Sequence, residues 1–140
     1  MEEKKAMTII LHSGDMDKAL AAFILATGAA AKGIQTTMFF TFWGMNIIKK
    51  DGAESAKLSK MNMGGLGKMM IKKMMKKKNV ATLQELIKDA KELGVHLIAC
   101  EMTMDLMNVP KESLIPEVTG IGGVGAYLDN ANDAQINLFV

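Results

Sequence analysis

The only cysteine of the chain, Cys100, is the side chain best suited to covalent chemistry. It follows a short apolar run, residues 95–99, and precedes Glu101 and a methionine-rich stretch. An apolar run with little alternation is typical of a parallel strand buried on both faces, so Cys100 should lie at the carboxyl end of its strand. Ligands bind at that edge of open α/β sheets. A nucleophilic thiol is one interpretation; the other is a small buried apolar residue, as unpaired cysteines commonly are.

Other polar and aromatic side chains should lie at the same edge, because they follow the first two predicted strands or the cysteine itself: His12, Ser13, Asp15, Trp43, Asn46 and Glu101. An imidazole can take the proton of a thiol, but whether His12 reaches Cys100 depends on the strand order. A helix that begins near residue 102 would stabilise a thiolate at Cys100, whereas Glu101 would oppose it. We therefore take Cys100 as the candidate catalytic residue and, as possible supporting residues, His12, Asp15, Trp43 and Glu101.

The segments that must position these side chains alternate between strands and helices. Apolar runs predict strands at 7–12, 35–41, 95–99, 118–121 and 135–140. Helical spacing predicts helices at 16–32, 68–78 and 82–93, with short helical turns at 42–48, 110–114 and 122–128 and a turn at 130–133. The 82–93 helix opens with a capping box, Thr82 with Glu85, and buries a regular stripe of Leu83, Leu86, Ile87, Ala90 and Leu93. We expect a single domain over residues 1–140, a three-layer α/β/α sandwich with a mainly parallel sheet of about five strands.

A segment rich in methionine, lysine and glycine interrupts this pattern at about residues 55–79. No acidic residue occurs between 55 and 84. The glycines at 64, 65 and 67 predict an irregular stretch over 61–67, and residues 68–78 predict a basic amphipathic helix. Its methionines form an adaptable apolar surface. We expect residues 61–78 either to be mobile or to complete a protomer contact near the cysteine. If the protein is instead a binding or assembly module, we expect this segment to contact a partner or an anionic membrane surface.

The amino-acid composition argues against nucleic-acid-binding and metal-binding proteins and favours a cytoplasmic homo-oligomer. The net charge is only +2 and all 17 basic residues are lysines, so the guanidinium forks used for nucleic-acid recognition are missing and we expect no nucleic-acid partner. One cysteine and two scattered histidines cannot form a closed zinc site, and residues 122–125 lack the spacing of a phosphate-binding loop, so we expect no metal and no cofactor. The lone cysteine and the direct passage from the first residues into a strand favour a cytoplasmic protein. Fourteen methionines and an apolar final strand favour a homo-oligomer.

Three stretches together resemble the DsrE/DsrF-like family, in the branch often labelled "peroxiredoxin family": Ile98-Ala-Cys-Glu-Met-Thr-Met-Asp-Leu-Met107, Phe39-Phe-Thr-Phe-Trp-Gly44, and the Met/Gly/Lys segment before Thr82. The resemblance runs from Ile9 to Tyr127. It implies a three-layer α/β fold, homo-oligomers that are often trimers or hexamers, and a sulfur relay in which one cysteine carries sulfur as a persulfide. That role falls on Cys100 alone.

The resemblance makes a sulfur carrier or sulfurtransferase the favoured function. Its partners would be donor and acceptor proteins or small sulfane-sulfur compounds. A conventional two-cysteine peroxidase would need a resolving cysteine, and this sequence has none. The alternative is a non-enzymatic oligomeric binding or assembly module in which Cys100 is structural.

Overall fold

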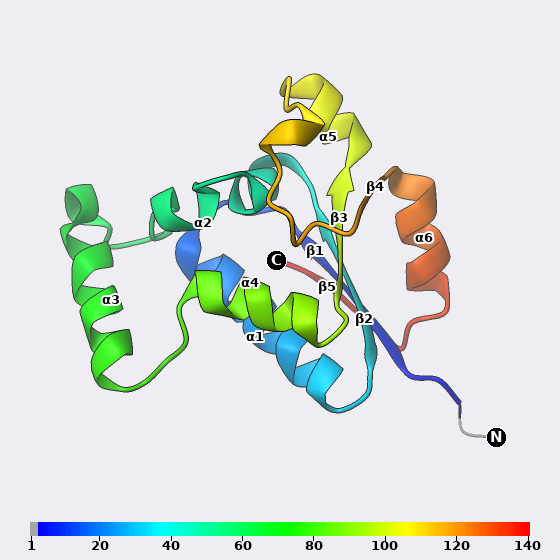
Figure 1. The fold of residues 1–140 in the computed structure, drawn as a ribbon, viewed down its shortest axis with the longest axis horizontal. Coiled ribbons are helices and arrows are strands. Elements are labelled where there is room, and N and C mark those ends of the chain that lie inside the picture. Colours follow the sequence, from blue (N-terminus) through cyan, green and yellow to red (C-terminus); the bar gives the residue numbers. More distant parts are fainter. Residues whose placement is uncertain (1–2) are drawn as a thin grey trace.

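Five strands form one parallel sheet in the computed structural model, which describes residues 3–140 (Figure 1). They are β1 (Ala6–Leu11), β2 (Gln35–Phe40), β3 (His96–Cys100), β4 (Gly120–Gly122) and β5 (Ile136–Phe139). The strand order is β4-β3-β2-β1-β5, and every neighbouring pair runs parallel. Each connection is long enough to cross back over the sheet, as parallel pairing requires. The predicted parallel strands are therefore confirmed.

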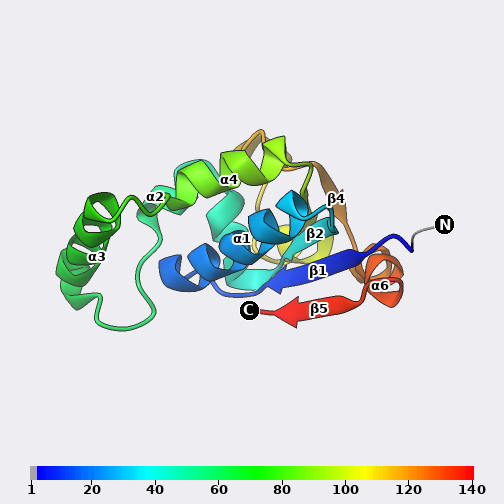
Figure 2. The same cartoon turned by 90° about the horizontal axis from the view of Figure 1, so that it is seen from below.

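Helices cover both faces of this sheet. Helix α1 (Met16–Ala31) packs against α4 (Leu83–Glu92), and Phe23 of α1 stacks on Phe40 of β2 with ring centroids 5.9 Å apart. On the other face, Tyr127 of α6 (Val124–Asn132) packs against Phe39, with centroids 5.4 Å apart. Consecutive strand residues point to opposite faces, so α1 and α4 form one layer and α6 forms the other. The three-layer α/β/α sandwich is confirmed (Figure 2).

Further helices and 3₁₀ turns occupy the connections. They are the 3₁₀ helix η1 (Phe42–Ile48), α2 (Gly52–Ser55), the 3₁₀ turn η2 (Met63–Gly65), α3 (Leu66–Lys77), α5 (Glu101–Leu106) and the 3₁₀ turn η3 (Lys111–Ser113). Helix α3 stands apart from the sheet, at the end of the molecule beyond α2 (Figures 1 and 2). Among residues 3–140, no helix is long and apolar enough to cross a membrane.

The capping box at the start of α4 is present as predicted. The Thr82 hydroxyl accepts a hydrogen bond from the Glu85 amide at 3.2 Å, and the Glu85 carboxylate accepts one from the Thr82 amide at 3.2 Å. The predicted stripe is buried up to Ala90. The prediction was wrong for Leu93, which is 46% exposed. Leu93 is the C-cap of the helix, and the chain turns there toward Gly94, which has a φ of 85°.

Three predicted boundaries were also wrong. Strand β4 begins at Gly120, because its ladder with β3 starts where Gly120 pairs with Ile98. Helix α6 continues through the predicted turn at 130–133 as far as Asn132, and the Asn130 side chain donates to the Ala126 carbonyl at 3.1 Å, which accommodates it inside the helix. The stretch predicted to be irregular contains η2 and the first turn of α3, so α3 begins at 66 rather than 68.

Candidate functional site

Cys100 is the last residue of β3 and lies between two strands of the sheet. On one side it pairs with Gly122 of β4, and on the other side the preceding residue, Ala99, pairs with Phe40 of β2. Cys100 is also the N-cap residue of α5, with an extended backbone at φ −70° and ψ 115°. The strand-end position predicted from the sequence is therefore correct. The side chain is only 4% exposed, so the thiol is buried in a single chain.

The thiol lies on the α6 side of the sheet. Ile98 and Cys100 share one face of β3 because side chains alternate along a strand. Ile98 pairs with Phe39, which packs on Tyr127 of α6. Gly122, the partner of Cys100, has no side chain, and α6 begins two residues after it. A thiol on this face is therefore bordered by the starts of both α5 and α6.

Thr103 fixes the turn that follows the cysteine, and sequence analysis did not identify it. Its side chain is fully buried. The Thr103 hydroxyl accepts a hydrogen bond from the Phe42 amide at 3.1 Å and shares another with the Thr41 hydroxyl at 3.1 Å. Phe42 has a φ of 48°, which is unusual for a non-glycine residue and has to be maintained by its surroundings. Thr103 therefore ties α5 to the end of β2. The sequence feature that could have identified it is an uncharged hydroxyl residue between two methionines, Met102 and Met104.

His12 does not reach Cys100, because β2 lies between their strands. Two strand spacings separate the ends of β1 and β3 by about 10 Å. The His12 ring instead lies against Phe42 and Phe139, with centroid distances of 5.5 and 5.6 Å. The His12 amide donates to the Val140 carbonyl at 2.8 Å. The pairing of imidazole and thiol, which the sequence left dependent on the strand order, is not formed in this structure.

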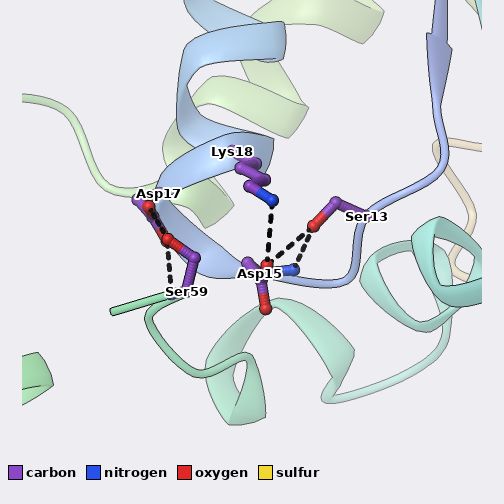
Figure 3. Close-up of polar contacts among 5 residues, drawn as sticks. All are labelled: Ser13, Asp15, Asp17, Lys18 and Ser59. Atoms are coloured by element: carbon purple, nitrogen blue, oxygen red, sulfur yellow. Dashed lines mark hydrogen bonds and ion pairs between the residues drawn. The ribbon is translucent and has the colours of Figure 1, made fainter. Parts of the chain in front are cut away.

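Asp15 belongs to the turn that opens α1 (Figure 3). The Ser13 hydroxyl donates to one Asp15 carboxylate oxygen at 3.0 Å and accepts a hydrogen bond from the Asp15 amide at 3.0 Å. The Lys18 ammonium lies 3.6 Å from the same carboxylate oxygen. These contacts give Asp15 a local structural role in the turn.

The neighbouring Asp17 ties α1 to the segment before α3 (Figure 3). Its carboxylate accepts hydrogen bonds from the Ser59 amide at 2.8 Å and from the Ser59 hydroxyl at 2.6 Å. Partial burial raises the pKa of Asp17, but the two hydrogen bonds from Ser59, together with a backbone hydrogen bond and the charge of Lys18, outweigh it and hold this pKa below its usual value.

A groove of about 640 Å³ gathers three of the predicted supporting residues, His12, Asp15 and Trp43. Trp43 is 56% exposed there. The groove is also lined by four lysines that the sequence analysis did not single out: Lys18, Lys49, Lys50 and Lys57. Cys100 does not line it, and Glu101 is the exposed first residue of α5. The structure thus separates the predicted residues into a lysine-lined groove and a buried cysteine.

Among residues 3–140, no three His, Cys, Asp or Glu side chains come together to hold a metal ion.

The fold and the site define a class of protein: a parallel α/β/α sandwich whose lone cysteine ends an inner strand. The comparison with protein families is more specific. The chain belongs to the DsrE/DsrF/DrsH-like family, whose model matches residues 3–57 and 52–139.

Two curated relatives match along nearly their whole length. The chain is 44% identical to the uncharacterized protein YrkE of Bacillus subtilis, over 99% of each chain. It is 35% identical to the sulfur carrier protein DsrE2 of Allochromatium vinosum, over 100% of each chain.

Two solved structures share the fold at low sequence identity. One is the protein of unknown function MTH1491 from Methanobacterium thermoautotrophicum, with a TM-score of 0.65 and 11% identity over 96% of this chain and 99% of that one. The other is the ychN protein of Escherichia coli, with a TM-score of 0.60 and 13% identity over 98% of this chain and 99% of that one. At these identities the likeness concerns the fold alone.

Proposed function

We propose that this protein is a sulfur-relay protein in which Cys100 carries sulfane sulfur as a persulfide. The observation that carries the proposal is the position of the only thiol at the carboxyl end of β3, in a chain similar to a sulfur carrier. Family membership supports the same role. The partners would be sulfur donor and acceptor proteins or small sulfane-sulfur compounds.

The chemistry requires one thiol and no second cysteine. The Cys100 thiolate attacks the outer sulfur of a donor such as thiosulfate, an S–S bond forms, and the S–S bond of the donor breaks. Sulfite leaves with the electron pair of that bond. An acceptor thiolate then attacks the outer sulfur of the persulfide, and Cys100 is released as a thiolate. Neither step consumes an oxidant or a reductant.

The thiol has to become accessible before either step. Helix α5 is only six residues long, and of its side chains only those of Thr103 and Met104 are buried. Local opening of such a short element costs less than global unfolding. We place the opening in α5, with the Thr103 hydrogen bonds as its restraint. Glu101, at the start of α5, would then move with the cysteine.

Exposed apolar side chains support a homo-oligomer, as the trimers or hexamers of the family imply. They lie on α6 and on the two outermost strands that it connects, β4 and β5: Ile121, Val124, Leu128, Ile136 and Phe139. Large apolar side chains left in solvent are typical of a subunit interface. His12 borders it through Phe139, so a second subunit would lie beside the carboxyl ends of the strands.

The test is the transfer of sulfur to the reduced protein. Incubation with polysulfide or thiosulfate should add about 32 Da per chain, removable by dithiothreitol, as expected for a persulfide. Cys100→Ser should abolish this addition while leaving the circular dichroism spectrum unchanged. An acceptor thiol should then recover the sulfur from the wild-type protein.

One observation favours a second function, a non-enzymatic assembly module with a structural cysteine: the burial of Cys100. In that case the native protein should resist both sulfur donors and a small alkylating reagent, and react only after denaturation. That result would contradict the sulfur-relay proposal.

A further inference from the structure

Helix α3 turns an apolar face away from the rest of the protein. Three apolar side chains follow one another at four-residue spacing, which places them on one face of a helix: Leu66, Met70 and Met74. They are 56%, 55% and 52% exposed. A surface helix normally turns its apolar side chains toward the core, so α3 is unusual in leaving these three in solvent.

The side of α3 that faces the protein carries Gly67, which is buried, and Met75, which is half-buried against the core. Lys72, Met75 and Lys76 line a cavity of about 590 Å³ together with residues of α1 and of the start of α4, including Leu20 and Leu83. Helix α3 therefore lies beside the domain across a cavity instead of packing tightly on it. It projects at one end of the molecule (Figures 1 and 2). Its outer face can meet an extended surface without any rearrangement of the sheet.

The same segment is strongly positive. Eight lysines and no acidic residue occur between residues 55 and 84. Other exposed methionines lie in and just before the helix, and they add to its apolar area: Met61, Met63 and Met69. A surface that combines flexible apolar side chains with clustered positive charge matches the two components of an anionic bilayer, acyl chains and negative headgroups.

We propose that α3 binds the surface of an anionic membrane, with Leu66, Met70 and Met74 in the headgroup region and the lysines against lipid phosphates. The positive charge of this segment, together with its apolar face, favours an anionic membrane over a second copy of the chain or a nucleic acid. Pairing α3 with the α3 of a second copy would bring lysines against lysines. A nucleic acid would satisfy the lysines but leave the apolar face in water.

The test is co-sedimentation of the full chain with lipid vesicles. Vesicles of phosphatidylcholine alone are compared with vesicles of phosphatidylcholine mixed with phosphatidylglycerol, at low and at physiological salt. We expect binding to the anionic vesicles, little binding to the neutral ones, and weaker binding as salt is added.

Two pairs of variants separate the two contributions. The double variant Met70→Ser, Met74→Ser should greatly reduce binding to anionic vesicles. Met102 is an equally exposed methionine on α5, and Met102→Ser should not reduce binding. Lys73→Gln with Lys77→Gln should weaken partitioning by about 25-fold, taking about five-fold per lysine at an anionic surface. The double change Lys5→Gln with Lys32→Gln has the same net charge outside α3 and should have a smaller effect. Unchanged thermal melting of the α3 variants shows that the loss is not a loss of fold.

Two results would overturn the proposal. One is equal binding to neutral and anionic vesicles, or none to either. The other is a Met70→Ser, Met74→Ser double variant that still binds lipid but no longer forms the oligomer in sedimentation equilibrium. That result would show that the apolar face of α3 pairs subunits.

Discussion

Replacing Thr103 by valine should both destabilise the protein and expose Cys100. Valine keeps the shape of threonine but cannot accept the hydrogen bond from the Phe42 amide or share one with the Thr41 hydroxyl. An amide left unsatisfied in a part-buried position costs about 1–3 kcal/mol, and the lost hydroxyl pair costs about 0.5–1.5 kcal/mol. Together these give about 1.5–4.5 kcal/mol, and we expect the free energy of unfolding to fall by about 2–3 kcal/mol, near the middle of that range.

Two assays check this expectation. With a urea dependence of about 2 kcal/mol per molar, the unfolding midpoint should fall by about 1 M or slightly more. If the same hydrogen bonds restrain α5, alkylation of Cys100 in native protein should accelerate by about 30-fold for each 2 kcal/mol lost from local opening. Thr103→Ser keeps the hydroxyl and serves as the matched control, losing only the burial of one methyl group. A Thr103→Val protein with the wild-type midpoint and alkylation rate would refute the assigned role of Thr103.

Three further changes test other parts of the structure. The pKa of Asp17 is held below its usual 3.8, so the stabilisation by its Ser59 hydrogen bonds is present above pH 3.8 and is lost as the pH falls through the lower folded pKa. The urea unfolding midpoint of Asp17→Asn should therefore fall less on acidification than that of the wild type. Identical pH profiles for the two proteins would contradict this. Thr82→Ala should lower the free energy of unfolding by about 1 kcal/mol and Thr82→Ser by less, measured by urea titration, because the alanine removes the N-cap of α4. Gly44→Ala would place a Cβ 2.0 Å from the Leu11 carbonyl oxygen, so a loss on the order of 3 kcal/mol is expected, and a near-normal melting temperature would show that the turn can shift.

Local patterns predicted the elements of this fold well. The capping box of Thr82 with Glu85 depends only on neighbouring residues, and it is present as predicted. The 3.6-residue spacing of the α4 stripe and the strand ending at Cys100 are likewise local. The wrong boundaries have tertiary causes. Where β4 begins depends on its pairing with Ile98, which no local pattern reveals.

The site was harder to predict, because it depends on strand order. His12 and Cys100 each follow an apolar run, and both do lie at the carboxyl edge of the sheet. The sequence could not show that β2 separates them. It also could not show the burial of Cys100, which is a property of the packed structure. Nor could it show that the hydroxyls of Thr41 and Thr103, 62 residues apart in the sequence, form a hydrogen bond.

The pairing of β5 with β1 has a consequence for the order in which the chain can fold. The Ala6 amide and the Gln135 side chain that accepts its hydrogen bond are 129 residues apart in sequence. During synthesis, β1 can pair with β2 early, but its other edge has no strand to cover it until β5 has left the ribosome. An uncovered edge of a hydrophobic strand is a template for pairing with other chains. Nascent or truncated chains lacking residues 135–140 should therefore aggregate more readily and depend more on chaperones, and this long-range pairing is expected to slow the last step of folding.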